Sequence, residues 1–271
     1  MSSRPDYGID SPTIVIGLFV ASVCGFAVAS LFGIPAHRHP FGQIAAIVIG
    51  SYFLLAACGM IWYSKVVKFR IRDSVLNTIP WRGDEIVLDV GCGRGLLLTG
   101  AARRLTTGKG IGLDLWLPGA LSGNQPDSAG RNARLEGVID RVELIKGDVR
   151  RLPFGDDSFD VAVSNFVLHE VDDGGERDQM LGEIARVLKP GGRVALVDFI
   201  FTGECLGTFR RLGISNLERQ RAGSFFSFWF GAVINFGLVQ TCQVTGTKPG
   251  DASGERNPEA EREHDPRNHT K

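Results

Sequence analysis

Two long stretches near the start of the chain contain no charged residue. The first covers residues 13–34 and the second covers residues 44–63. At a rise of about 1.5 Å per residue, a helix of either length would cross a hydrocarbon core of about 30 Å. We therefore predict a transmembrane helical hairpin over residues 13–63, preceded by an N-terminal segment, residues 1–12. The alternatives are buried helices of a soluble protein or, for the first stretch, a secretory signal peptide.

Small residues recur at every fourth position in both stretches. They are Gly17, Ala21, Gly25, Ala29 and Gly33 in the first stretch, and Gly42, Ala46 and Gly50 in the second. In an antiparallel hairpin these two stripes would face each other and let the backbones pack closely. They would also allow oligomerisation through the transmembrane hairpin. A composition rich in Ala and Gly that produces the stripes by chance is the alternative.

Basic residues crowd the chain just after the second stretch. They are Lys65, Lys68, Arg70 and Arg72, whereas the residues that connect the two stretches contain only Arg38 with two histidines. By the positive-inside rule, both termini are expected in the cytoplasm. Residues 64–80 are predicted to form a basic linker helix, because Val67, Ile71, Val75 and Ile79 recur at every fourth position. Its basic side would face anionic headgroups or simply water.

From residue 84 the pattern changes to alternating short strands and helices. Strands are predicted at residues 85–90, 110–113, 141–146, 159–164, 193–200 and 239–246, and helices at residues 96–105, 128–136, 179–188 and 203–212. Such alternation predicts an α/β domain, residues 81–247, with a mostly parallel, doubly wound sheet covered by helices on both faces. Residues 189–192 (KPGG) are expected to separate a helix from a strand. Residues 248–271 are charged and nearly devoid of apolar residues, which predicts a disordered tail.

Charge and cysteine usage exclude some classes of function. The chain has 30 basic and 30 acidic residues, so its net charge of zero argues against a nucleic-acid partner. Five cysteines lie far apart, without CxxC or Cys/His clusters, so we expect neither a disulfide framework nor a metal site.

The most specific motif is VLDVGCGRG at residues 87–95. It joins an apolar strand that carries an acid to a glycine-rich turn and a helix. A dinucleotide-binding turn reads GxGxxG and receives a pyrophosphate, but here the third glycine comes one residue early. Asp89 would repel a phosphate and suits a ligand that carries positive charge. Cys92 is expected to be a small buried residue, and Arg94 an exposed turn residue rather than a partner of a ligand carboxylate.

This motif resembles the D-x-G-x-G-x-G signature of the class I S-adenosylmethionine-dependent methyltransferases. The resemblance covers about residues 75–249 and implies a Rossmann-like sheet of seven strands with S-adenosylmethionine as cofactor. It implies that Asp89 and the backbone of the three turn glycines, Gly91, Gly93 and Gly95, hold the methionyl part. It also implies further cofactor-binding residues at the ends of the next strands: Asp114 and Leu115 at the ribose, Asp148 and Val149 at the adenine, and Asn165 near the methyl group. Each acid taken alone is also compatible with a helix cap or Asx turn.

The segment SNFVLHEV, residues 164–171, resembles the L-H-x-V segment of the ubiquinone and menaquinone C-methyltransferases and their small-molecule relatives. It lacks the N-P-P-Y sequence typical of enzymes that methylate nucleic-acid amines. His169, with Glu170 beside it, is the candidate general base, because a histidine accepts protons near neutral pH. The alternative is that His169 only caps or packs at the start of the next helix. The aromatic stretch at residues 225–236 is expected to form an apolar lid, a bilayer contact or a buried edge.

The sequence thus supports a membrane-anchored methyltransferase, multi-pass with two spans and a cytoplasmic catalytic domain, that acts on a small-molecule or lipid-like acceptor. A non-catalytic membrane adaptor that binds S-adenosylmethionine is an alternative. A nicotinamide-dependent oxidoreductase is disfavoured by the glycine spacing and by Asp89.

Overall fold

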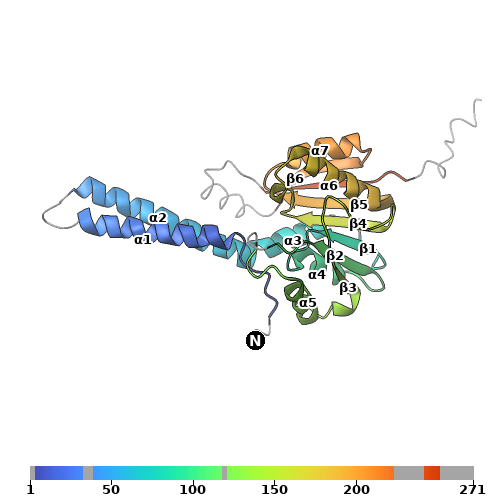
Figure 1. Cartoon of the computed structure of the whole chain (residues 1–271), viewed down its shortest axis with the longest axis horizontal. Coiled ribbons are helices and arrows are strands. Elements are labelled where there is room, and N and C mark those ends of the chain that lie inside the picture. Colours follow the sequence, from blue (N-terminus) through green and yellow to red (C-terminus); the bar gives the residue numbers. More distant parts are fainter. Residues whose placement is uncertain (1–3, 33–38, 118–120, 223–240, 251–271) are drawn as a thin grey trace, which may run out of the picture.

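The computed structural model describes residues 4–32, 39–117, 121–222 and 241–250. A hairpin of two long helices projects from an α/β domain (Figure 1). The aromatic stretch expected at residues 225–236 and the expected tail after residue 250 lie outside the described residues.

The hairpin consists of helices α1 (Pro12–Phe32) and α2 (Pro40–Trp62). Both are long and apolar enough to cross a membrane, and only 17% and 22% of their apolar windows are buried. Most large apolar side chains that the described residues expose, such as Ile16 and Leu55 at 63% and 66%, lie on these two helices. Exposed apolar surface on this scale marks contact with a partner or a membrane.

The two helices touch where glycine meets glycine. A Cβ added to Gly25 would lie 2.8 Å from the Cα of Gly50. The predicted small-residue stripes therefore meet in the middle of the hairpin, but they do not run its full length, since a Cβ at Gly17 would meet nothing within 4 Å. The residues of α1 that are buried lie seven positions apart and are Val15, Ser22 and Ala29. Along an α-helix, four residues turn about 40° more than one full turn, whereas seven residues turn only about 20° less than two full turns. Residues spaced by seven therefore stay on the face of α1 that contacts α2, and residues spaced by four drift away from it.

Helix α2 does not stop at the end of the predicted span. It continues through a π-helical turn, η2 (Tyr63–Val67), into α3 (Lys68–Leu76). Ile71 and Val75 of α3 are 1% and 0% exposed, so the apolar side of this helix packs on the domain. Lys68, counted above among the basic flank, is also buried at 4% exposure, because its ammonium group donates to the carbonyls of Tyr7 and Gly8.

The domain is built on one sheet of seven strands in the order β3-β2-β1-β4-β5-β7-β6. The strands are β1 (Ile86–Val90), β2 (Lys109–Asp114), β3 (Val142–Lys146), β4 (Phe159–Asn165), β5 (Leu188–Asp198), β6 (Ser215–Arg221) and β7 (Cys242–Thr247). All neighbours pair in parallel except that β7 is antiparallel to both β5 and β6. This confirms the predicted doubly wound, mostly parallel seven-stranded fold.

Helices cover both faces of the sheet, as Figure 1 shows. They are α4 (Leu96–Ala102), α5 (Pro126–Leu135), α6 (Gly174–Val187) and α7 (Thr202–Arg211), with short 3-10 turns η3 (Ile139–Arg141) and η4 (Leu168–Glu170). Alternate strand residues point to opposite faces. Val87 therefore packs with α3 and α4, and its neighbour Leu88 packs in the cluster formed with α6 and α7.

Two local predictions differ from the structure. Strand β6 was not expected, because its sequence SNLERQR is polar and it lies at the sheet edge, where its residues are mostly exposed. Residues 189–192 do not separate a helix from a strand, since β5 begins at Leu188, directly after α6. In the pairing of β5 with β4, Phe159 lies opposite Leu188 and Val161 lies opposite Arg193. Residues 189–192 are therefore extra residues of β5 that form a bulge.

The packing of the hairpin predicts a position-dependent effect of enlarging its glycines. Gly25→Val should force the helices apart, because its side chain would overlap the backbone of Gly50. Overpacking of this kind costs about 1–3 kcal/mol. Gly17→Val is the matched control, since a side chain there meets open space. Thermal unfolding of the full chain in detergent micelles should show a lower first transition for Gly25→Val only. Equal effects of both substitutions would contradict the packing described.

Candidate active site

The glycine-rich turn connects β1 to α4 at the edge of a large cavity. Gly91, Gly93 and Gly95 adopt φ angles of +71°, +51° and +82°, a left-handed region that other residues rarely enter. A side chain at Gly91 would also overlap the side chain of Val167. The glycines therefore let the turn pass close to the cavity without filling it.

Asp89 lies at the floor of this cavity and is only 2% exposed. Its carboxylate accepts a hydrogen bond of 2.8 Å from the backbone N–H of Leu98 in the first turn of α4. Burial raises the pKa of Asp89 to about 8, against the lowering effect of that hydrogen bond. A positively charged group placed beside Asp89 would be stabilised by the carboxylate and would in turn favour its ionised form.

Asp114 and Asp148 lie at the ends of the next two strands and line the same cavity. The carboxylate of Asp114 accepts backbone hydrogen bonds from Gly93 at 2.8 Å and from Trp116. Asp148 forms an ion pair of 2.6 Å with Arg150, whose hydrogen bond holds the pKa of Asp148 below its usual value. The structure thus brings together acids that the chain separates, and Leu115 and Val149 line the cavity beside them.

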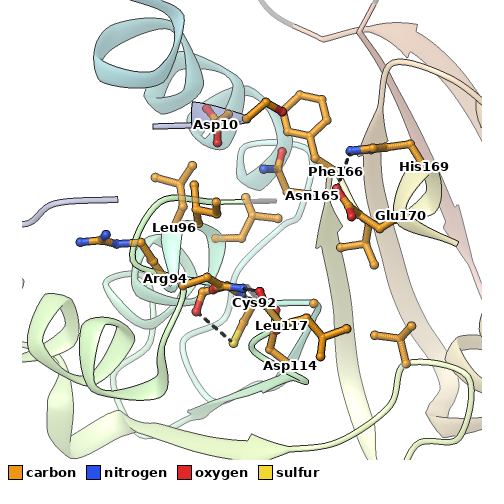
Figure 2. Close-up of a pocket in the computed structure, with 18 of the residues that line it drawn as sticks. Asp10, Cys92, Arg94, Leu96, Asp114, Leu117, Asn165, Phe166, His169 and Glu170 are labelled. Carbon is orange, nitrogen blue, oxygen red and sulfur yellow. Dashed lines mark hydrogen bonds and ion pairs between the residues drawn. The ribbon is translucent and has the colours of Figure 1, made fainter. Parts of the chain in front are cut away.

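The cavity has a volume of about 770 Å³, within the range of about 300–1,000 Å³ typical of small-molecule sites. Every predicted cofactor-binding residue lines it except Gly95, the N-cap residue of α4. Figure 2 shows Asp114 and Cys92 on one side of the cavity and Asn165, His169 and Glu170 on another. Cys92 is 6% exposed, as expected of a small buried residue. Among the described residues, no group of three or more His, Cys, Asp or Glu side chains could hold a metal ion.

His169 lies in η4 between two carboxylates. Its Nδ1 atom is 3.2 Å from Asp198, which is fully buried, and its Nε2 atom is 3.1 Å from the half-exposed Glu170. Burial lowers the pKa of His169, but the hydrogen bond and charge of Asp198 outweigh it, so that the pKa lies above 6.5. The carboxylate of Asp198 also accepts a backbone hydrogen bond of 2.7 Å from Phe199, which fixes its position. Asp198 was missed as a site residue, although it ends β5 as Asp114 ends β2.

Residues 4–11 of the N-terminal segment, to which the sequence assigned no role, form a strap that packs across the site and lines the cavity with Tyr7, Asp10 and Ser11. Tyr7 is 3% exposed, and its hydroxyl lies 2.7 Å from that of Thr99 in α4. Arg94 is buried rather than exposed, which corrects the expectation for this residue. Its guanidinium forms a 3.1 Å ion pair with Asp6 of the strap and donates to the carbonyl of Ser122.

Residues 88–196 match a family model described as a methyltransferase domain. This part of the chain is therefore that of a methyltransferase domain. It is 40% identical over 136 residues to methyltransferase GfsG of Streptomyces halstedii, a match that covers 49% of this chain and 45% of that protein. It is 35% identical over 144 residues to the 2-phytyl-1,4-naphtoquinone methyltransferase of Synechocystis sp., covering 51% of this chain and 57% of that protein. The matched region thus spans about half the length of these curated relatives.

The fold is shared with solved methyltransferase structures. One is the geranyl diphosphate C-methyltransferase of Streptomyces coelicolor A3(2), solved with Mg2+, geranyl-S-thiolodiphosphate and S-adenosyl-L-homocysteine. The match has a TM-score of 0.52 and 19% identity, and it covers 65% of this chain and 74% of that chain. The predicted class, an S-adenosylmethionine-dependent methyltransferase domain, is confirmed.

The burial of Asp89 predicts proton release when S-adenosylmethionine binds. With a pKa of about 8, Asp89 is mostly protonated at pH 7, and an ammonium group beside it would lower that pKa and expel the proton. Titration calorimetry in buffers of different ionisation enthalpy should therefore detect more proton release at pH 7 for the wild type than for Asp89→Asn. The difference in proton release between the wild type and Asp89→Asn should disappear above pH 8, where Asp89 is already ionised. Asp89→Asn should also weaken binding of S-adenosylmethionine by about 1–3 kcal/mol.

Asp114→Asn is the matched control for this measurement, because it removes another strand-end carboxylate that lines the cavity. It should weaken binding and leave the excess proton release in place. Equal proton release in the wild type and in Asp89→Asn would show that Asp89 does not face the ammonium group.

Proposed function

We propose that this chain is a membrane-anchored methyltransferase that moves a methyl group from S-adenosylmethionine to a small-molecule or lipid-like acceptor. The observation that carries the proposal is that one cavity is lined both by the strand-end acids and by His169. In this proposal residues 13–63 anchor the chain and residues 81–247 catalyse the transfer.

The cofactor would lie along the edge of the sheet. Asp89 and the turn glycines hold the amino and carboxylate groups of the methionyl part, because a buried acid favours an ammonium group. Asp114 and Leu115 bind the ribose, and Asp148 and Val149 bind the adenine. Asn165, at the end of β4, lies beside the cavity region where the methyl group would meet the acceptor.

His169 supplies the proton acceptor for an acceptor molecule that bears a hydroxyl group. Bound S-adenosylmethionine supplies the methyl group on a sulfonium centre. As the acceptor oxygen takes the methyl group, its proton passes to Nε2 of His169. Asp198 acts as a positioning residue, because it holds Nδ1 and stabilises the imidazolium that forms. Glu170 contacts Nε2 and moves aside when the acceptor takes its place.

The exposed apolar hairpin supports a membrane anchor. Helices buried in a soluble core would be mostly covered, whereas α1 and α2 are not. A relative named as a 2-phytyl-1,4-naphtoquinone methyltransferase acts on a molecule with an apolar chain, which supports a lipid-like acceptor.

The basic residues after α2 support an orientation with the catalytic domain and both termini in the cytoplasm, by the positive-inside rule. In a variant without the native cysteines, a thiol reagent applied outside should label His39→Cys in the hairpin connection. It should label Arg131→Cys, exposed on α5, only after the membrane is permeabilised. The reverse labelling pattern would refute this orientation.

The proposed activity is tested by incubating the full chain with methyl-labelled S-adenosylmethionine and a membrane lipid extract. Label should enter an extractable product, and His169→Gln should lower kcat by about 10²- to 10⁴-fold with little change in cofactor affinity. Cofactor binding without any transfer would favour the non-catalytic adaptor.

The pH profile separates a catalytic dyad from a structural one. Only neutral His169 accepts a proton, so kcat should rise with pH as His169 loses its proton. The midpoint of this rise should lie above pH 6.5, because the pKa of His169 is raised. Asp198→Asn removes the charge that raises this pKa and should shift the midpoint to lower pH while also lowering kcat. Glu170→Gln, at a half-exposed position, should shift the midpoint less. If kcat rises at the same pH in Asp198→Asn as in the wild type, His169 is excluded as the base.

A further inference from the structure

The cavity does not end at the catalytic domain. Ile14 of α1, Met60 of α2 and Tyr63 of the π-helical turn line the same cavity as Asp89 and His169. No sequence pattern assigned these residues to a site, because the hairpin was expected to act only as an anchor. The ends of both helices of the hairpin are therefore part of the wall around the reacting groups.

An aromatic wall connects the base of the hairpin to the candidate base. The ring of Tyr63 lies 6.2 Å from that of Phe166, which in turn lies 6.2 Å from the ring of His169. Phe199 completes this wall, with its ring 4.4 Å from that of His169. Phe166 has a φ of +57°, a conformation that is strained for a bulky residue and that is found at functional sites.

The π-helical turn lies where this wall begins. Tyr63–Val67 interrupts an otherwise continuous helix, and single π turns inside α-helices are frequent at functional sites. Tyr63 and Ser64 of this turn, and Lys68 directly after it, all line the cavity.

The depth of these residues matches a membrane interface. Helix α1 has 21 residues and is about 31 Å long, close to the thickness of a hydrocarbon core. Ile14 and Met60 lie within one turn of the end of the apolar hairpin, and Trp62 and Tyr63 follow in the position typical of interfacial aromatic residues. The cavity wall formed by the hairpin therefore lies at the level where lipid chains end and headgroups begin.

We propose that Ile14, Met60 and Tyr63 form an acceptor subsite that receives the apolar chain of a membrane lipid laterally from the bilayer. The head of the lipid reaches His169, and its chain runs along the base of the hairpin into the hydrocarbon. This inference rests on the proposed function and adds how the acceptor enters and which residues select its chain.

A photoreactive lipid tests the subsite without any methyl transfer. The probe is a phenol with a long prenyl chain that carries a diazirine, placed with the full chain in vesicles of phosphatidylcholine and phosphatidylglycerol. Crosslinks should map to peptides that contain Ile14 or Met60. Met60→Trp and, on the other helix, Ile14→Trp should each lower this labelling about tenfold by filling the subsite. Leu55→Trp and Ile16→Trp are the matched controls, because these exposed hairpin residues do not line the cavity.

Transfer selectivity supplies the second readout. The ratio of methylation of the long-chain phenol to methylation of the same phenol without a chain should fall about tenfold in Met60→Trp and Ile14→Trp. Labelling spread evenly along the hairpin, or an unchanged ratio in both variants, would overturn the subsite and leave the proposed function intact. Labelling at the hairpin base in a chain that methylates nothing in the membrane extract would support the subsite and refute methyl transfer.

Discussion

Parallel pairing of β1, β2, β4 and β5 is the constraint on which the site depends. It places the carboxyl ends of these strands at one edge of the sheet, where Asp89, Asp114, Asn165 and Asp198 follow one another. The strand order reverses between β1 and β4, so the connections leave toward opposite faces and open a crevice at that edge. The cavity occupies this crevice, and its chemistry is set by which residues end the strands.

The buried acids at this edge differ in how the protein satisfies them. Asp198 is enclosed by donors, because Phe199 and His169 both donate backbone hydrogen bonds to it in addition to the imidazole contact. Asp89 accepts a hydrogen bond from Leu98, and no ion pair reaches it among the described residues. A buried carboxylate without a cation is costly, which is why the pKa of Asp89 is raised. One acid is therefore suited to hold a neighbouring side chain and the other to receive a positively charged ligand.

Features that follow from local periodicity could be predicted from the sequence. The alternation of strands and helices indicated the doubly wound sheet, and the glycine turn after β1 indicated the edge of the sheet where the cavity lies. Asp198 could have been found by the same strand-end argument as Asp114. The strap could not, because its contacts, such as Asp6 with Arg94, join residues 88 positions apart and no local pattern records them. The four-residue stripe of the hairpin failed at Gly17 because a seven-residue period follows the contact between two helices more closely.

In the proposed membrane-anchored state, the helix that runs from the hairpin into the domain would decide how the domain sits on the membrane. Pro40–Leu76 spans 37 residues, about 55 Å, without a flexible joint, and its last part is buried against the domain. A flexible linker would let the domain leave the surface and expose the cavity mouth to water. Here the buried Lys68 fixes the helix to the strap through the carbonyls of Tyr7 and Gly8, and the strap is fixed to the glycine-rich turn through Arg94. The hairpin, the strap and the glycine turn are thus joined by buried and partly buried contacts, so that in the proposed anchored state the depth of the hairpin in the bilayer would also set the height of the cavity above it.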